Sequence, residues 1–298
     1  MPMQKSFRLG LIGHPVAHSK SPEIFAKFFE QHFQAQAQID SKSLSERFGS
    51  ADYQLFDLPD LTQFNNWLGS EINNPSPLVG FNVTVPHKTA IIPYLDELSP
   101  AAHHLQAVNS VVIQYNTNTQ KPYLVGHNTD VIGFEKSLEQ TIAISQSTTT
   151  QNGMPDASNN PNHISPQFAI ILGNGGSAKA VRYVLNQHHI PNQTWHRGKV
   201  INQIDIHLNE DISLDTPIPN HALIIQTTPV GMWPNIQDCI DFPFEQLNHT
   251  HWAIDLIYNP ETTAFMKHCI NQGATVMNGR YMLQKQAEAA WEIFHQNL

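Results

Sequence analysis

Residues 168–178 read FAIILGNGGSA, and this stretch decides the fold class. Five consecutive apolar residues have the pattern of a short buried strand, and a glycine-rich turn follows them directly. Beyond the turn, the apolar spacing of Ala180, Val181, Val184 and Leu185 indicates a helix. A buried strand that passes through such a turn into a helix is typical of the first unit of a nucleotide-binding α/β domain.

The turn itself has the spacing Gly173-x-Gly175-x-x-Ala178. The first glycine permits a tight turn, the second lets the backbone approach a pyrophosphate, and the small third residue lets helix and strand pack closely. The N-terminus of the helix adds N–H donors and a partial positive charge. The spacing alone is a weak signal, because a glycine-rich turn in another α/β protein looks the same.

The rest of the chain alternates apolar strands with helical patterns. Strands are predicted at 7–12, 79–85, 108–115, 123–125, 222–226 and 252–257, and helices from residue 22 and at 87–95, 261–270 and 282–294. This alternation predicts a parallel sheet covered by helices. The polar segment 34–50 has no clear pattern, and segment 145–166, rich in Ser, Thr, Asn and Pro, is expected to be a flexible connection.

Composition excludes several classes of protein. The 298 residues, 40% of them hydrophobic, suffice for two domains, and the net charge of −9 argues against nucleic-acid or anionic-membrane binding. No apolar stretch is long enough to span a bilayer, and residues 1–11 make a poor signal peptide. Two cysteines do not form a disulfide framework, and the paired histidines lack a carboxylate set for a metal. We therefore expect a soluble cytoplasmic protein without a metal site.

Polar residues outside the glycine-rich unit indicate where a substrate binds. Ser19 and Ser21 lie at a strand-to-helix turn, where two hydroxyls and the helix dipole suit a carboxylate. Thr84 and Lys88 flank the end of an apolar strand, and a lysine beside a carboxylate in a partly buried pocket can relay a proton. The alternatives are that Ser21 only caps the helix, that Ser19 is exposed and that Lys88 is a surface lysine.

Further candidates lie later in the chain. Asp130 is the natural carboxylate partner for Lys88, although a helix-capping role also explains it, and Asn109 is otherwise a turn residue. Tyr258 either points into a cleft or is a core aromatic residue. Gln286, on a helical pattern near the C-terminus, is structural when considered alone.

One arginine bears on the choice of dinucleotide. Arg197 falls about 20 residues after the glycines, where the residue that contacts the adenosine ribose belongs. An acidic residue there accepts hydrogen bonds from the free 2′-hydroxyl of NAD, whereas Arg197 would pair with a 2′-phosphate. The residue type therefore favours NADP, with a solvated surface arginine as the alternative.

Taken in order, these segments resemble the shikimate dehydrogenase family. The matching blocks are GHPVAHSKSP at 13–22, GFNVTVPHK at 80–88, AVNS at 107–110, GHNTD at 126–130, GNGG at 173–176, TTPVGM at 227–232, DLIYNP at 255–260 and GRYMLQKQA at 279–287. The blocks span the chain in the order that the family has, so the set is far more specific than any one of them.

The resemblance implies a fold and a reaction. An N-terminal α/β substrate domain of residues 1–129 would be completed by residues 279–298, with a Rossmann-type dinucleotide-binding domain of residues 130–278 and a cleft between them. The reaction would be the reversible, NADP-dependent and metal-free reduction of 3-dehydroshikimate to shikimate, in chorismate and aromatic amino acid biosynthesis. The enzyme would be a monomer or a homodimer.

The resemblance also implies roles for residues. Lys88 and Asp130 would be the catalytic pair, in which Lys88 moves the hydroxyl proton and Asp130 holds it in place. The substrate ligands would be Ser19 and Ser21 for the carboxylate and Thr84, Asn109 and Gln286 for the ring hydroxyls, together with Tyr258. The cofactor ligands would be Gly173, Asn174, Gly175, Gly176, Ser177, His196, Arg197, Thr227, Met232 and Gly279.

Three departures from the family pattern concern the cofactor side. The family's Asn-Arg-Thr is His196-Arg197-Gly198 here, Ile201 stands where many members carry a second arginine, and Gln226 replaces the usual Asn. Three alternatives therefore stay open: an NAD-preferring quinate/shikimate dehydrogenase, a dinucleotide-binding regulatory module without turnover, and an α/β binding protein without a cofactor. Segments 34–52 and 145–166 look like insertions relative to a short family member.

Overall fold

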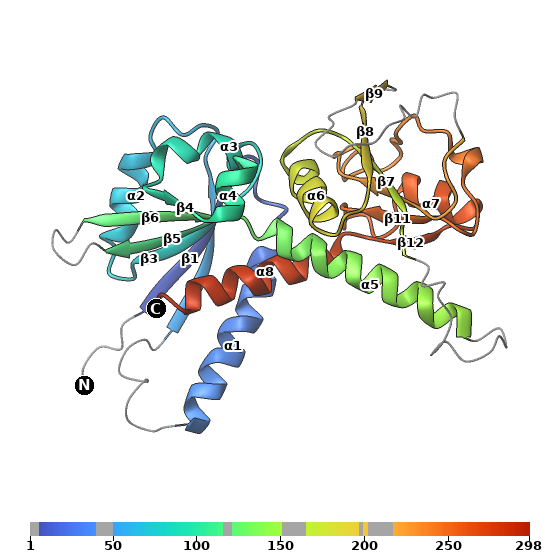
Figure 1. Ribbon diagram of the computed structural model, residues 1–298. Helices are drawn as coiled ribbons and strands as arrows, with labels where there is room; N and C mark the ends of the chain where they lie inside the picture. Colours follow the sequence, from blue (N-terminus) through green and yellow to red (C-terminus); the bar gives the residue numbers. More distant parts are fainter. Residues whose placement is uncertain (1–5, 40–49, 116–120, 151–164, 197–198, 202–216) are drawn as a thin grey trace. The chain divides into compact units, whose positions relative to one another are not determined.

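The computed structural model describes residues 6–39, 50–115, 121–150, 165–196, 199–201 and 217–298 (Figure 1). The chain divides into two compact units, each with its own six-stranded sheet. Unit 1 comprises Met1–Thr129 and Gln286–Leu298, and unit 2 comprises Asp130–Lys285. The mixed α/β class predicted from the alternation of strands and helices is confirmed.

The sheet of unit 1 has the strand order β2-β1-β3-β5-β6-β4. Its strands are β1 (Ser6–Gly13), β2 (Ser50–Asp57), β3 (Leu78–Val83), β4 (Glu97–Leu98), β5 (Ser110–Tyr115) and β6 (Pro122–His127). β1 pairs in parallel with β2 and β3, but β5 is antiparallel to both β3 and β6. The prediction of a parallel sheet is therefore wrong for part of this unit, because the connection from β5 to β6 is too short for a parallel crossover.

The helices of unit 1 are α1 (Ser21–Ile39), α2 (Phe64–Ile72), α3 (His87–Ala90), α4 (Pro100–Leu105) and the end of α8 (Arg280–His295). The helix predicted at 87–95 is shorter than expected, because the chain changes to a 3-10 turn at Ile92–Tyr94. Pro93 lies in this turn and has no N–H to continue an α-helix. α1 continues to Ile39 through the start of the segment that had no clear pattern.

One core of unit 1 joins the first strand to the last helix. Phe7 and Phe25 are buried together with Ala290 and Phe294 of α8. A side chain at Gly80 would meet the ring of Phe294 at 2.6 Å, so the glycine lets α8 lie close against β3. The C-terminal helix thus completes the core of the N-terminal unit.

The sheet of unit 2 has the order β12-β11-β10-β7-β8-β9. The strands are β7 (Phe168–Leu172), β8 (Asn192–His196), β9 (Lys199–Ile201), β10 (Ala222–Gln226), β11 (Trp252–Asp255) and β12 (Thr275–Met277). All pairings are parallel except that of β9 with β8. The strand order reverses between β7 and β10, and doubly wound sheets bind ligands at the carboxyl ends of the strands at this position.

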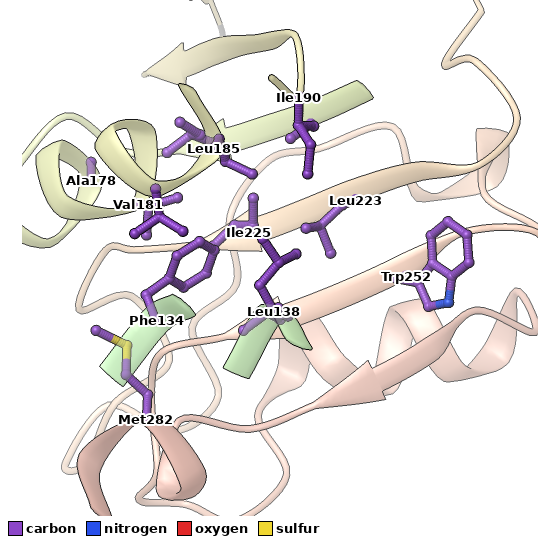
Figure 2. Packing of buried hydrophobic residues seen from close by; sticks show 14 residues of the cluster. Phe134, Leu138, Ala178, Val181, Leu185, Ile190, Leu223, Ile225, Trp252 and Met282 are labelled. Carbon is purple, nitrogen blue, oxygen red and sulfur yellow. The ribbon is translucent and has the colours of Figure 1, made fainter. Parts of the chain in front are cut away.

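The helices of unit 2 are α5 (Asp130–Thr150), α6 (Gly176–Gln187), α7 (Ala264–Asn271) and the start of α8. Figure 2 shows Phe134 and Leu138 of α5 packed with Val181 of α6 and Ile225 of β10 in one buried cluster. The flexible connection predicted from residue 145 is wrong for residues 145–150, which continue α5. Ser and Thr are only mildly unfavourable in a helix that packing has already anchored. Residues 151–164 lie outside the described residues.

The fold also bears on membranes and metals. Within the described part of the chain, no helix is both long and apolar enough to cross a membrane. The same residues contain no group of three histidine, cysteine or acidic side chains suited to hold a metal ion.

Candidate functional site

The loops that follow β1 and β3 are held together by backbone hydrogen bonds. Thr84 N–H donates to Ile12 O at 2.9 Å, and His14 N–H donates to Val85 O at 3.0 Å. Parallel pairing of β1 and β3 brings their carboxyl ends to one edge of the sheet. The loop of Ser19 and the segment of Thr84 are therefore neighbours at this edge.

The two predicted carboxylate-binding serines are adjacent. Ser19 Oγ accepts a hydrogen bond from Ser21 N–H at 3.2 Å and donates to Ser21 Oγ at 3.1 Å. Ser21 is buried at the start of α1, whereas Ser19 is half-buried. Ser19 Oγ is thus the side chain seen to accept from a backbone N–H at the start of α1. Two adjacent hydroxyls at a helix N-terminus suit a carboxylate.

Asn109 and Gln286 meet although 177 positions separate them. Asn109 Oδ1 accepts from Thr129 N–H at 2.7 Å, and Asn109 Nδ2 donates to Thr129 Oγ1 at 3.0 Å and to Gln286 Oε1 at 3.5 Å. Thr129 Oγ1 also lies 3.3 Å from Gln286 Oε1. The end of α8 thus brings an amide to the loop that follows β6.

Asn82 and Tyr53 extend the group of residues around Asn109. Asn82 Nδ2 donates to Ser110 Oγ at 2.8 Å and to Asn109 O at 3.2 Å. Tyr53 OH donates to Asn82 Oδ1 at 2.8 Å. Burial raises the pKa of Tyr53 far above its usual value and outweighs the lowering by the side chain of Ser21, so the phenol is neutral. We call the two hydrogen-bonded groups together the polar network: Ser19, Ser21, Tyr53, Asn82, Asn109, Ser110, Thr129 and Gln286.

The polar network contains residues that the sequence did not single out. Asn82 precedes Thr84 by two positions, and residues with this spacing in a strand point to the same face. The predicted role of Thr84 could therefore have drawn attention to Asn82. Tyr53 carried no signal, since only the register of β2 on β1 places it there.

The predicted catalytic residues lie at the starts of two helices. Lys88 is half-buried on α3, and its carbonyl accepts from Val108 N–H at 2.7 Å, next to Asn109. The buried ring of His87 lies 2.6 Å from Leu58 O and fixes the start of α3. Lys88 belongs to unit 1, whereas Asp130 is the first residue of α5 and of unit 2.

The glycine-rich turn of unit 2 leaves open space above the N-terminus of α6. Gly173 has a φ of +112°, and a side chain there would meet Thr227 Oγ1 and the Thr228 methyl group, each at 2.7 Å. A Cβ at Gly175, by contrast, would have nothing within 4 Å. Gly175 is the N-cap of α6, and Gly176 and Ser177 begin that helix. The turn therefore fits an anionic group such as a diphosphate.

The turn after β10 explains one departure from the family pattern. Gln226 is fully buried, donates to Val230 O at 3.0 Å and accepts from Thr228 N–H at 2.8 Å. Thr227 Oγ1 donates to Leu172 O at 2.7 Å and joins this turn to the end of β7. Met232 follows the same turn and is exposed. Gln226 thus stands where the family usually has asparagine, and both its amide nitrogen and its amide oxygen are hydrogen-bonded.

Unit 2 also contains the remaining predicted residues. Tyr258 is half-buried shortly after β11, and Asn174 is exposed in the glycine-rich turn. Gly279 is buried against the backbone carbonyl of Leu256, where no side chain fits. His196 ends β8, and Arg197 lies outside the described residues.

Comparison with known proteins gives a consistent family. The family model described as shikimate dehydrogenase substrate binding domain matches residues 11–111. The chain is 31% identical over 299 residues to a shikimate dehydrogenase (NADP(+)) of Desulforamulus reducens, covering 96% of this chain and 88% of that protein. It is 33% identical over 309 residues to the corresponding protein of a Nostoc species, covering 98% and 92%.

Solved structures show the same similarity. A shikimate dehydrogenase in complex with NADP+ is 28% identical, covers 99% of this chain and 94% of its own, and superposes with a TM-score of 0.71. A Thermus thermophilus shikimate 5-dehydrogenase in complex with NADP(H) and shikimate shares the fold at 24% identity, with coverages of 98% and 94% and a TM-score of 0.66.

Proposed function

The chain belongs to the shikimate dehydrogenase family, and on this premise we propose that it catalyses the reversible NADP-dependent reduction of 3-dehydroshikimate to shikimate. The observation that carries the proposal is the polar network, which contains the paired hydroxyls of Ser19 and Ser21 and the paired amides of Asn109 and Gln286 within unit 1. Such a set offers hydroxyl donors for a carboxylate and amide groups for ring hydroxyls. A small acid with several hydroxyls is the substrate that this chemistry suits.

In the proposed complex, the substrate lies on unit 1. The hydroxyls of Ser19 and Ser21 donate to the carboxylate, and the dipole of α1 favours its negative charge. The side chains of Thr84, Asn109 and Gln286 bind the ring hydroxyls. Tyr258 of unit 2 is proposed as a further ligand. Unit 1 with residues from 279 onward is then the substrate domain, and residues 130–278 are the NADP domain.

The catalytic step is assigned to Lys88 and Asp130. Bound NADPH would supply the hydride that reduces the ring carbonyl carbon. Lys88 donates a proton to the carbonyl oxygen as it becomes a hydroxyl, and takes that proton back in the oxidation direction. Asp130 accepts a hydrogen bond from Lys88 and holds the same hydroxyl in place. Proton transfer and positioning of the two reactants account for most of the rate.

NADP is assigned to unit 2. The open space at Gly175 and the N-terminus of α6 support a diphosphate site. Arg197 is proposed to pair with the 2′-phosphate, and the further cofactor ligands are those that the resemblance implies: Gly173, Asn174, Gly176, Ser177, His196, Thr227, Met232 and Gly279. The relatives' names and the NADP-bound structure support NADP over NAD.

Location and assembly complete the proposal. Both cysteines of the chain are free thiols, Cys239 and Cys269, as expected in the reducing cytoplasm, where we place the enzyme. We propose that it acts as a monomer or a homodimer.

An activity assay tests the proposal against its rivals. Purified protein is mixed with shikimate or quinate and with NADP or NAD, and the absorbance of the reduced nicotinamide is followed. We expect the highest kcat/KM for shikimate with NADP. A preference for quinate with NAD would identify the rival dehydrogenase, and binding without turnover would identify a regulatory module.

A further inference from the structure

Tyr53 is a buried residue to which the proposed reaction assigns no role. It lies on β2 opposite Leu9 of β1, and its ring stacks on that of Phe25 with centroids 4.4 Å apart. Packing in the apolar core therefore explains the position of the ring. It does not explain the hydroxyl, which donates a hydrogen bond to Asn82 Oδ1 at 2.8 Å.

The direction of this hydrogen bond is fixed by the other contacts of Asn82. Its Nδ2 group donates to Ser110 Oγ at 2.8 Å and to Asn109 O at 3.2 Å, so the oxygen of the amide must face Tyr53. Tyr53 therefore donates its only proton to Asn82. Burial keeps the phenol protonated, as this direction requires.

Tyr53 consequently begins a chain of hydrogen bonds. Asn82, which accepts from Tyr53, holds the backbone carbonyl of Asn109, whose own side chain contacts Gln286.

We propose that Tyr53 is a positioning residue for the substrate: its hydroxyl fixes Asn82, and through Asn82 it holds Asn109, whose amide binds the ring hydroxyls. The inference rests on the proposed function, since it names a residue that acts through the ligands of that same site. Tyr53 touches neither the reacting carbon nor the cofactor. The groups that it positions bind substrate and transition state alike, so its loss raises KM for shikimate and leaves kcat unchanged.

The test is the substitution Tyr53→Phe, which keeps the ring stack and removes only the hydroxyl. Asn82 Oδ1 then loses its buried donor, and we expect KM for shikimate to rise by about fivefold to fiftyfold. The kcat value and KM for NADP should stay close to those of the wild type, while the unpaired oxygen of Asn82 should lower the Tm by a few degrees. Tyr123→Phe is the matched control, because its exposed hydroxyl binds Glu97 outside the polar network.

A double-mutant cycle with Asn82→Ala examines the route of the effect. If Tyr53 acts through Asn82, the rise in KM from Tyr53→Phe largely disappears in the Asn82→Ala background. An effect of full size in the double variant would overturn the coupling.

Other outcomes are equally decisive. An unchanged KM for shikimate in Tyr53→Phe, or a lowered Tm with unchanged kinetics, would make the hydroxyl merely structural and overturn the inference. An inactive wild-type protein would contradict the proposed function itself, and this result is obtained before any variant is made.

Discussion

The carboxylate of Asp255 is fully buried at the end of β11 and supports the loop that carries Tyr258. It accepts hydrogen bonds from Ile257 N–H at 2.9 Å and from Thr263 Oγ1 at 2.5 Å. These bonds favour the charged form, but burial outweighs them and raises the pKa of Asp255 from its usual 3.8 to about 6. The folded protein therefore holds this proton more tightly than the unfolded chain does.

This difference predicts a loss of stability as the pH rises. The unfolded carboxyl ionises near pH 3.8 and the folded one near pH 6, so the contribution of Asp255 falls across this window and is constant above it. Relative to Asp255→Asn, which cannot ionise, the wild type should lose on the order of 2 kcal/mol of unfolding free energy between about pH 4 and pH 7. Urea denaturation across this range measures the difference, and the exposed Asp238→Asn serves as control. A difference that does not vary with pH would contradict the prediction.

Single residues also show what the sequence can and cannot reveal about the site. Ser19, Ser21, Asn109 and Gln286 belong to short motifs that the sequence alone reveals. In unit 1 Ser19 bonds to Ser21, and Asn109 bonds to Gln286. Tyr53 was missed because its position depends on the pairing of β2 with β1, a long-range register with no local signature. The roles of Lys88 and Asp130 stay predictions.

At the scale of elements, the turn from β7 into α6 contains two glycines, Gly173 and Gly175, with different structural roles. Gly173 needs both its positive φ and its missing side chain, because Thr227 and Thr228 fill the space beside it. Gly175 has an ordinary φ of −85° and open space beside it. One glycine therefore serves the fold, and the other leaves room for a ligand.

Alanine substitutions should separate these two roles. Gly173→Ala is expected to lower the free energy of unfolding by about 1–3 kcal/mol. Gly175→Ala should leave the Tm nearly unchanged and raise KM for NADP, because the added methyl group occupies the space of the diphosphate. Chemical denaturation and steady-state kinetics provide the two readouts, with Gly69→Ala on α2 as a control that also has open space. Normal NADP kinetics in Gly175→Ala would exclude this site.

Element boundaries were predicted less well than element types. The glycine-rich turn and the apolar runs gave β7, α6 and β10, because buried strands and helices leave strong local patterns. Three other features depend on context rather than on periodicity. α3 ends early because a proline follows, α5 continues to Thr150 because packing anchors the helix, and β5 is antiparallel to β6 because the connection between them is short.

The whole molecule is two α/β units, and the chain passes between them where Asp130 follows Thr129 and where Gln286 follows Lys285. Thr129 belongs to the polar network, so the chain enters unit 2 directly from the proposed substrate site. We propose that Lys88 of unit 1 and Asp130 of unit 2 act on one substrate oxygen. Under this proposal the catalytic pair is complete only when both units contribute to it.

The kinetics of Lys88→Ala test this claim most directly. With shikimate and NADP, kcat should fall by about a hundredfold to ten-thousandfold, while KM for shikimate changes only a few-fold, because the proton relay is lost and the binding groups remain. Lys136→Ala is the matched control, since this exposed lysine on α5 pairs only with Glu139 among the ion pairs of the described residues. Turnover of Lys88→Ala near that of the wild type would contradict the account.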